Sequence, residues 1–150
     1  MGKQNRVFLF TDGSCDGNPG PGGYAAILKK GRWKKEIVGS IPHSSNNRME
    51  LQAVISGLSA VRPCSQVKVY CDSQYVVDAI AEGRVMEWQN NGWRRIRTLE
   101  PIKNADLWRN YLSIVQDRKL SVIFHKIAAH KGHQMNERVD FLARQAAKGA

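Results

Sequence analysis

Residues 6–12 read RVFLFTD, with an apolar side chain at nearly every position before the closing acid. A continuous apolar run of this length is typical of a β-strand that is buried on both faces. The Gly-, Pro- and Asn-rich stretch at residues 13–23 predicts a turn. Two short strands are predicted after it at residues 24–30 and 34–41, joined around Gly31. The chain is therefore expected to begin with three consecutive antiparallel strands.

The hydrophobic period changes at the asparagine pair of residues 46–47. Apolar residues then recur at helical spacing as far as Val61; an asparagine can cap the start, and Pro63 closes the segment. Residues 66–72 (QVKVYCD) alternate in polarity and end in another acid, which predicts a strand.

The rest of the chain alternates between helical and strand patterns. Ser73 can cap a helix that runs to about Ala81, and a polar insert that carries tryptophan and arginine follows it. Further elements are predicted as a helix near residues 106–116, a strand at 120–127, a turn at 132–135 and a last helix within NERVDFLARQAAK.

This order of elements predicts an α/β fold. Helical crossovers place the first, fourth and fifth strands parallel, and such crossovers are almost always right-handed. We expect a five-stranded mixed sheet, three antiparallel strands plus two parallel strands, flanked by helices. The sequence contains no repeat or linker, and 150 residues suffice for one core, so residues 1–150 are expected to form a single domain.

The composition favours a polyanionic partner. The formal charge is +10 and the pI is near 9.9, so the long-range field attracts nucleic acid. Basic composition also serves solubility alone, so this argument needs a site to support it. Cys15, Cys64 and Cys71 form no CxxC pair and are expected to be free thiols. Without a leader or a long apolar run, we expect a cytoplasmic monomer with no membrane partner.

Four acids occupy positions where they can meet. Asp12 and Asp72 end predicted parallel strands, and Glu50 lies in the first turn of the helix between them. Asp140 projects from the last helix on the face opposite Val139. Clustered carboxylates repel one another unless a hard cation such as Mg²⁺ binds them, and two such ions can promote phosphodiester displacement. Any one of these acids alone is more often a cap or a solvated charge.

The segments around these acids carry a family resemblance. In order they read TDGSCDGNPGPGGYAAIL, NNRMEL, DSQYV and AHKGHQMNERVDFLA. Together they resemble the successive signatures of type 1 ribonuclease H, as bacterial members carry them. The resemblance implies a ribonuclease H-like fold and hydrolysis of the RNA strand of RNA/DNA hybrids, which leaves 5′-phosphate and 3′-hydroxyl ends. It also implies Mg²⁺ as the cofactor, with Mn²⁺ as a possible substitute.

The resemblance also assigns catalytic roles. Asp12, Glu50, Asp72 and Asp140 would be the metal ligands. His130 would lie on a flexible loop beside the second metal ion and help to position water or release product. The alternative for His130 is an imidazole on a surface loop with no catalytic role.

Substrate contacts follow from the same resemblance. The groove that faces sugars and bases would include Cys15, Asn18, Asn46, Asn47 and Gln74, and the hybrid's RNA strand presents 2′-hydroxyls there. The two asparagines at 46–47 can also act as helix caps. A pocket for a phosphate of the DNA strand would include Asn18 again, with Ser45 and Asn104.

The polar insert resembles the basic protrusion with which bacterial members grip the hybrid. It covers about residues 82–104 and carries Trp88, Trp93, Arg94, Arg95 and Arg97. The tryptophans can equally serve to pack the protrusion.

Three positions depart from the family pattern or stay open. Residues 89–91 (QNN) replace a stretch that is often basic, so the grip is expected to depend more on the arginines. Ala129 replaces a common glycine before His130 and can stiffen the loop. Arg138 can pair with Asp140 or Glu137, or contact phosphate.

Two other functions compete with hybrid cleavage. One is a nuclease of the same fold that acts on DNA, such as a transposase or a junction resolvase, although those families lack the NNRMEL asparagines and the His130 loop. The other is a catalytically inactive hybrid-binding module, against which the presence of all four acids argues. Any processivity is expected to come from the catalytic domain, because the sequence leaves no room for a separate hybrid-binding domain.

Overall fold

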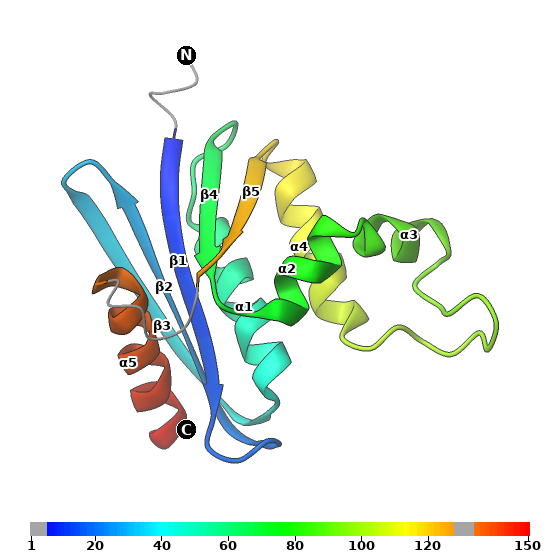
Figure 1. The fold of residues 1–150 in the computed structure, drawn as a ribbon, viewed down its shortest axis with the longest axis horizontal. Helices are drawn as coiled ribbons and strands as arrows, with labels where there is room; N and C mark the ends of the chain where they lie inside the picture. The colour runs from blue at the N-terminus through cyan, green and yellow to red at the C-terminus, as the bar shows by residue number, and fades with distance from the viewer. Residues whose placement is uncertain (1–5, 128–133) are drawn as a thin grey trace.

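A five-stranded sheet forms the centre of the molecule in the computed structural model, which describes residues 6–127 and 134–150 (Figure 1). Its strands are β1 (Arg6–Cys15), β2 (Gly20–Lys30), β3 (Trp33–Ser44), β4 (Gln66–Cys71) and β5 (Ser121–Lys126). They lie in the order β3-β2-β1-β4-β5. The first three strands pair antiparallel, and β4 and β5 add to β1 in parallel. The predicted mixed sheet is confirmed.

The predicted turn at residues 13–23 is mostly strand, so that prediction was wrong in extent. β1 continues to Cys15 and β2 already begins at Gly20, with the two strands paired from Asp12↔Ala25 to Cys15↔Gly22. Several of the glycines that suggested a turn instead allow neighbouring chain segments to approach the sheet closely.

Five helices connect or follow the strands. They are α1 (Asn46–Ser59), α2 (Gln74–Ala81), α3 (Arg84–Asn90), α4 (Ala105–Asp117) and α5 (Gln134–Lys148). The Ser73 cap is confirmed, since its hydroxyl accepts the Val76 N–H at 3.2 Å. The cap of α1 is Ser45 rather than an asparagine, and its hydroxyl accepts the Arg48 N–H at 3.3 Å. Among the described residues, none of the helices has the length and apolar character needed to cross a bilayer.

The polar insert contains a short helix that the sequence pattern did not predict. Gly83 precedes α3 in a left-handed conformation, and no side chain caps the helix, so the usual start signal is missing. Trp88 packs its ring 5.9 Å from that of the fully buried Trp108, and Arg109 lies over the Trp93 ring. Figure 1 shows α3 and the following loop projecting away from the sheet.

Helices cover both faces of the sheet (Figure 1). On one face α1 packs on β1 and β2, and α4 packs behind α1, with Leu9, Val69, Leu51 and Trp108 among the buried residues. On the other face α5 packs on β1 and β2 through an apolar cluster of Phe10, Ala25, Ile27, Val139 and Ala143.

Two glycines allow these helices to approach the sheet. A Cβ on Gly13 would lie 2.2 Å from the Met49 carbonyl carbon and 2.3 Å from the Glu50 nitrogen. A Cβ on Gly23 would lie 2.2 Å from the Ala143 carbonyl oxygen. Real Cβ atoms do not approach other atoms so closely, so any side chain at these positions must displace α1 or α5.

Gly23→Ala is expected to lower the free energy of unfolding by about 1–3 kcal/mol and reduce nuclease activity, because α5 must shift. Denaturant unfolding with parallel activity assays would measure both effects. Gly149→Ala is the matched control, since its Cβ would meet nothing closer than 3.8 Å. Equal behaviour of the two variants would show that α5 does not depend on this close approach.

Candidate active site

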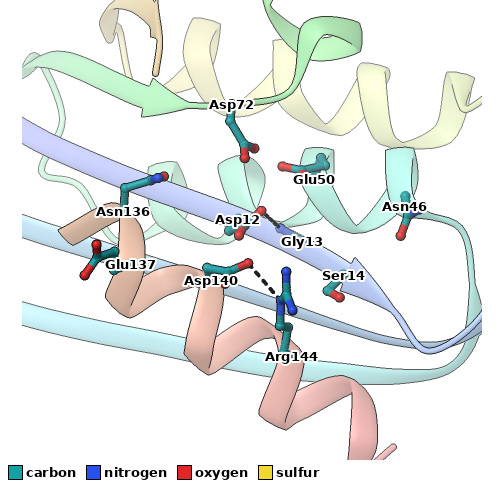
Figure 2. Close-up of a pocket in the computed structure, with 10 residues that line it drawn as sticks. All are labelled: Asp12, Gly13, Ser14, Asn46, Glu50, Asp72, Asn136, Glu137, Asp140 and Arg144. Carbon is teal, nitrogen blue, oxygen red and sulfur yellow. Dashed lines mark hydrogen bonds and ion pairs between the residues drawn. The ribbon is translucent and has the colours of Figure 1, made fainter. Parts of the chain in front are cut away.

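Three carboxylates meet at the carboxyl end of β4, where its pairing with β1 stops; Asp12 does not end β1, as was predicted, because β1 continues to Cys15. Asp12 lies two residues beyond the last β1–β4 pair, Phe10↔Tyr70, and Asp72 directly follows β4. Glu50 comes from the second turn of α1 rather than from the predicted first turn, and Gly13 allows this part of α1 to lie against β1. One oxygen from each of the three acids lies within 4.8 Å of the others. Figure 2 shows the three side chains pointing toward one another.

A fourth carboxylate faces this cluster from α5, the helix on the opposite face of the sheet from α1. Asp140 projects from α5 into the same hollow of about 330 Å³ (Figure 2). Arg144, one helical turn later, pairs with Asp140 at 3.1 Å. Among the described residues, Arg144 is the one cation in the hollow's lining, where Glu137 also lies.

Burial and mutual repulsion raise the pKa of two of these acids, Asp12 and Glu50. Burial, then the charge of Asp72 and the neighbouring Asp140, raise the pKa of Asp12 from 3.8 to about 7. Burial and the charge of Asp12 raise the pKa of Glu50 well above its ordinary value. Burial likewise raises the pKa of the Cys71 thiol to about 12. The site therefore disfavours the charged states of Asp12 and Glu50.

The acids match the needs of a hard divalent cation. Asp12 is only 6% exposed, and the buried oxygen Oε2 of Glu50 accepts no hydrogen bond from the described residues. A buried acceptor without a partner is destabilising, and a bound cation would satisfy it. Clustered carboxylate oxygens are the ligands that Mg²⁺ and Mn²⁺ prefer.

A turn beside the hollow is fixed by side-chain to backbone hydrogen bonds. The Cys15 N–H donates to Asn46 Oδ1 and the Asn46 N–H donates to Asn18 Oδ1, each at 3.0 Å. These bonds fasten the β1–β2 turn to the start of α1. Three residues predicted to contact substrate are thus held together at one rim.

The family comparison decides the identity. The family model for RNase H matches residues 4–148 of the chain. The chain belongs to the ribonuclease H family. It is accordingly a nuclease, of a family that depends on divalent metal ions, and the predicted family is confirmed.

Named relatives share most of this ribonuclease H sequence. The ribonuclease H of Bradyrhizobium sp. (strain ORS 278) is 47% identical over 92% of this chain and 87% of its own length. That of Chlorobium phaeobacteroides (strain BS1) is 43% identical over 97% of each chain.

Solved structures share the fold. The crystal structure of LC9-RNase H1, a type 1 RNase H with the type 2 active-site motif, superposes with a TM-score of 0.82. It has 30% identity to this chain and covers 97% of this chain and 73% of its own. LC11-RNase H1, solved in complex with RNA/DNA hybrid, has a TM-score of 0.67 and 19% identity over 95% of this chain and 97% of its own.

The other two predicted groove residues lie at the starts of α1 and α2. Asn47 is exposed in the first turn of α1. Gln74 begins α2, where its side chain donates to Asp78 Oδ1 and accepts from Lys126 Nζ. Their contact with substrate stays a prediction.

The predicted phosphate pocket contains an arginine that received no role from the sequence. Asn104 is buried; its Oδ1 accepts from Arg48 Nη1 at 3.1 Å, and its Nδ2 donates to the Tyr75 hydroxyl at 3.0 Å. Arg48 also pairs with Asp106 at 2.6 Å. Asn104 therefore anchors Arg48 beside the Ser45 cap, and phosphate binding by this group stays a prediction.

The protrusion exposes its three arginines. Arg94, Arg95 and Arg97 are solvent-exposed, and Arg94 Nη1 donates to the Leu99 carbonyl at 2.9 Å. The half-buried Trp88 and Trp93 pack against the core, as the packing alternative predicts. Any substrate contact of these five residues stays a prediction.

His130, predicted to have a catalytic role, lies outside the described residues. Two basic residues of α5 form ion pairs that the sequence analysis did not predict. Arg138 pairs with Glu36 of β3 at 2.8 Å, and not with Asp140 or Glu137, the two acidic partners that the sequence left open; contact with phosphate stays a prediction. Helical phase explains this, because Arg138 faces β3 while Asp140 faces the hollow. The Asp140–Arg144 pair was missed, although i,i+4 spacing on a helix is a known signal.

The raised pKa of Asp12 predicts how stability depends on pH without metal. The folded state retains a proton that the unfolded state releases near pH 3.8, so stability falls as pH rises through about 4 to 7. The loss amounts to about 1.4 kcal/mol per pKa unit. Melting in chelator should show this fall, and Mg²⁺ should raise the melting temperature more at about pH 8 than at about pH 5.

Asp12→Asn should flatten this pH dependence and should raise the stability of the metal-free protein near pH 8. Asp117→Asn, which removes an exposed carboxylate at the end of α4, is the control for charge alone. If both variants keep the wild-type pH profile, Asp12 is not the group that loses its proton.

Proposed function

We propose that this ribonuclease H cuts the RNA strand of RNA/DNA hybrids by two-metal-ion catalysis, with Mg²⁺ as its cofactor and Mn²⁺ as a substitute. The products are 5′-phosphate and 3′-hydroxyl ends. The observation that carries the proposal is the cluster of Asp12, Glu50 and Asp72 oxygens within 4.8 Å, with Asp140 across the same hollow. The family to which the chain belongs supports the choice of substrate.

The four acids would hold the metal ions. When bound, divalent ions would supply an activated water and would stabilise the leaving oxygen of the phosphodiester. Asp12 is only 6% exposed and the Oε2 atom of Glu50 is buried, so water reaches both carboxylates poorly and their charge depends on a cation. Asp140 lies on α5, and its pair with Arg144 fixes the orientation of its carboxylate toward the hollow.

The rim supplies polar groups for a sugar-phosphate backbone. Because Asn46 Oδ1 already accepts the Cys15 N–H, its amide nitrogen is the part directed to other acceptors. Arg144 adds a cation next to the acids, where a phosphate group must approach. Short polar donors of this kind suit recognition of 2′-hydroxyls across a shallow minor groove.

The proposal extends to the setting of the protein. Its basic charge of +10 favours association with the polyanionic hybrid. A monomer in the cytoplasm, without a membrane partner, remains our expectation from the sequence.

Cleavage of a hybrid labelled on its RNA strand tests the proposal. In Mg²⁺ the hybrid should yield 5′-phosphate and 3′-hydroxyl ends, while single-stranded RNA and duplex DNA survive. Chelator should stop the reaction, and Asp12→Asn should reduce the rate by at least about a thousandfold while hybrid binding persists. Retained binding is expected because the substitution leaves the basic surface intact.

Several outcomes would contradict the proposal. Equal cutting of duplex DNA would indicate a DNA nuclease of the same fold. Binding without cleavage in Mg²⁺ or Mn²⁺ would indicate an inactive hybrid-binding module. Loss of binding in Asp12→Asn would mean that Asp12 acts as a contact or a structural residue.

A further inference from the structure

Within residues 6–127 and 134–150, one face of the sheet is only partly covered. Helix α5 packs on β1 and β2 and, less closely, on β3, and Figure 1 shows it lying away from β4 and β5. The opposite faces of β4 and β5 are buried by α1, α2 and α4. The residues of β4 and β5 that point to the α5 side therefore form an open strip beside the helix.

Rings and apolar side chains lie along this strip. The cross-strand register places Phe8, Lys68 and Ile123 in one row, and Ile123 is 61% exposed. In the next such row the Tyr70 ring stacks on that of the exposed His125, with centroids 5.4 Å apart. Lys68 Nζ lies 5.7 Å from the centre of the Tyr70 ring. Apolar and aromatic side chains that gather on an open sheet face can mark a binding site.

The charge of the strip has a single sign. Arg6, Lys68 and His125 line a hollow of about 380 Å³ there, and within the described residues no carboxylate lines it. The other lining residues are apolar or are the polar first residues of β4 and β5: Phe8, Val67, Ile123, Gln66 and Ser121. An anionic ligand with flat apolar parts fits this lining.

We propose that the strip, defined by Arg6, Phe8, Lys68, Ile123 and His125, binds single-stranded nucleic acid. Phosphates would pair with the two cations, and bases would pack on the exposed His125 ring and on Phe8 and Ile123. The first and last rows, at Arg6 and Phe10 of β1, are four residue steps or about 13 Å apart, which is room for about two or three bases.

The strip leads toward the catalytic hollow. Lys126 pairs in register with Cys71, directly before Asp72, and its Nζ donates to Gln74 at 2.6 Å. A strand that leaves the hollow beside Asp72 can therefore continue along β4 and β5. In this respect the inference rests on the proposed function, because it assigns the strip to single-stranded tails of the cleaved substrate.

Direct binding tests the strip. The full chain in chelator is titrated into a labelled oligothymidylate of about fifteen nucleotides, with anisotropy as the readout. Arg6→Ala/Lys68→Ala should weaken binding about tenfold and reduce the slope of log K against log salt by about one. His125→Ala should weaken it about fivefold through lost stacking. Lys34→Ala/Lys35→Ala, exposed on β3, removes the same charge at the far side of the sheet.

Equal losses in the two double variants would overturn the inference, since net charge alone would then explain binding. Tighter binding of oligoglutamate than of oligothymidylate, lost in Arg6→Ala/Lys68→Ala, would also overturn it and indicate an acidic protein partner. His125→Ala, on an exposed edge strand, keeps the test open if the double variant does not fold.

Cleavage separates this inference from the proposed function. The wild-type chain should cut a hybrid with a single-stranded tail faster than a blunt hybrid. The strip variants should cut the blunt hybrid at the wild-type rate and should lose this preference for the tailed hybrid. If the wild-type chain cuts no hybrid, the proposed function fails, while the oligothymidylate titration still decides the strip.

Discussion

The close approach of two helices to the sheet is the constraint on which the active site depends. At Gly13 and Gly23 the backbones of α1 and α5 lie where a Cβ atom would be. The first contact sets Glu50 beside Asp12, and the second sets α5 so that Asp140 faces them. Without either, the acids would stand farther apart and the hollow would lose its charge density.

That geometry has an electrostatic consequence for the metal-free protein. Burial and neighbouring charge raise the pKa of Asp12 to about 7, and Glu50 shifts in the same direction. Cores that bury like charges lose stability, and natural proteins accept this at functional sites. A divalent cation reverses the effect because it favours the ionised form of each ligand. The instability of the empty site and its affinity for metal are therefore one property.

The sequence predicted the sheet because its strands differ in pattern. The unbroken apolar run before Asp12 matches β1, which helices bury on both faces. The alternating pattern before Asp72 matches β4, which helices bury on one face. Both acids follow the last parallel pairing, so the rule for strand ends places them correctly. The extent of β1 was missed because Gly13 was interpreted as part of a turn, whereas it serves a contact between distant segments.

Other features depend on contacts that no local pattern records. Helix α3 has no side-chain cap, and its 7 residues are too few to show a clear helical pattern in the sequence. The packing of Trp88 on Trp108 holds it in place. Arg138 takes Glu36 as its partner across 102 positions of sequence. The open strip on β4 and β5 was equally hidden, since it exists only because α5 covers the other strands.

The most direct test is a crystal structure of the wild-type protein with Mn²⁺ and a hybrid whose RNA strand resists cleavage. Anomalous scattering locates the metal ions without reference to the protein. The account predicts two peaks about 4 Å apart, bound by Asp12, Glu50, Asp72 and Asp140 beside the RNA strand. A single peak, or peaks away from these carboxylates with the hybrid in place, would contradict it.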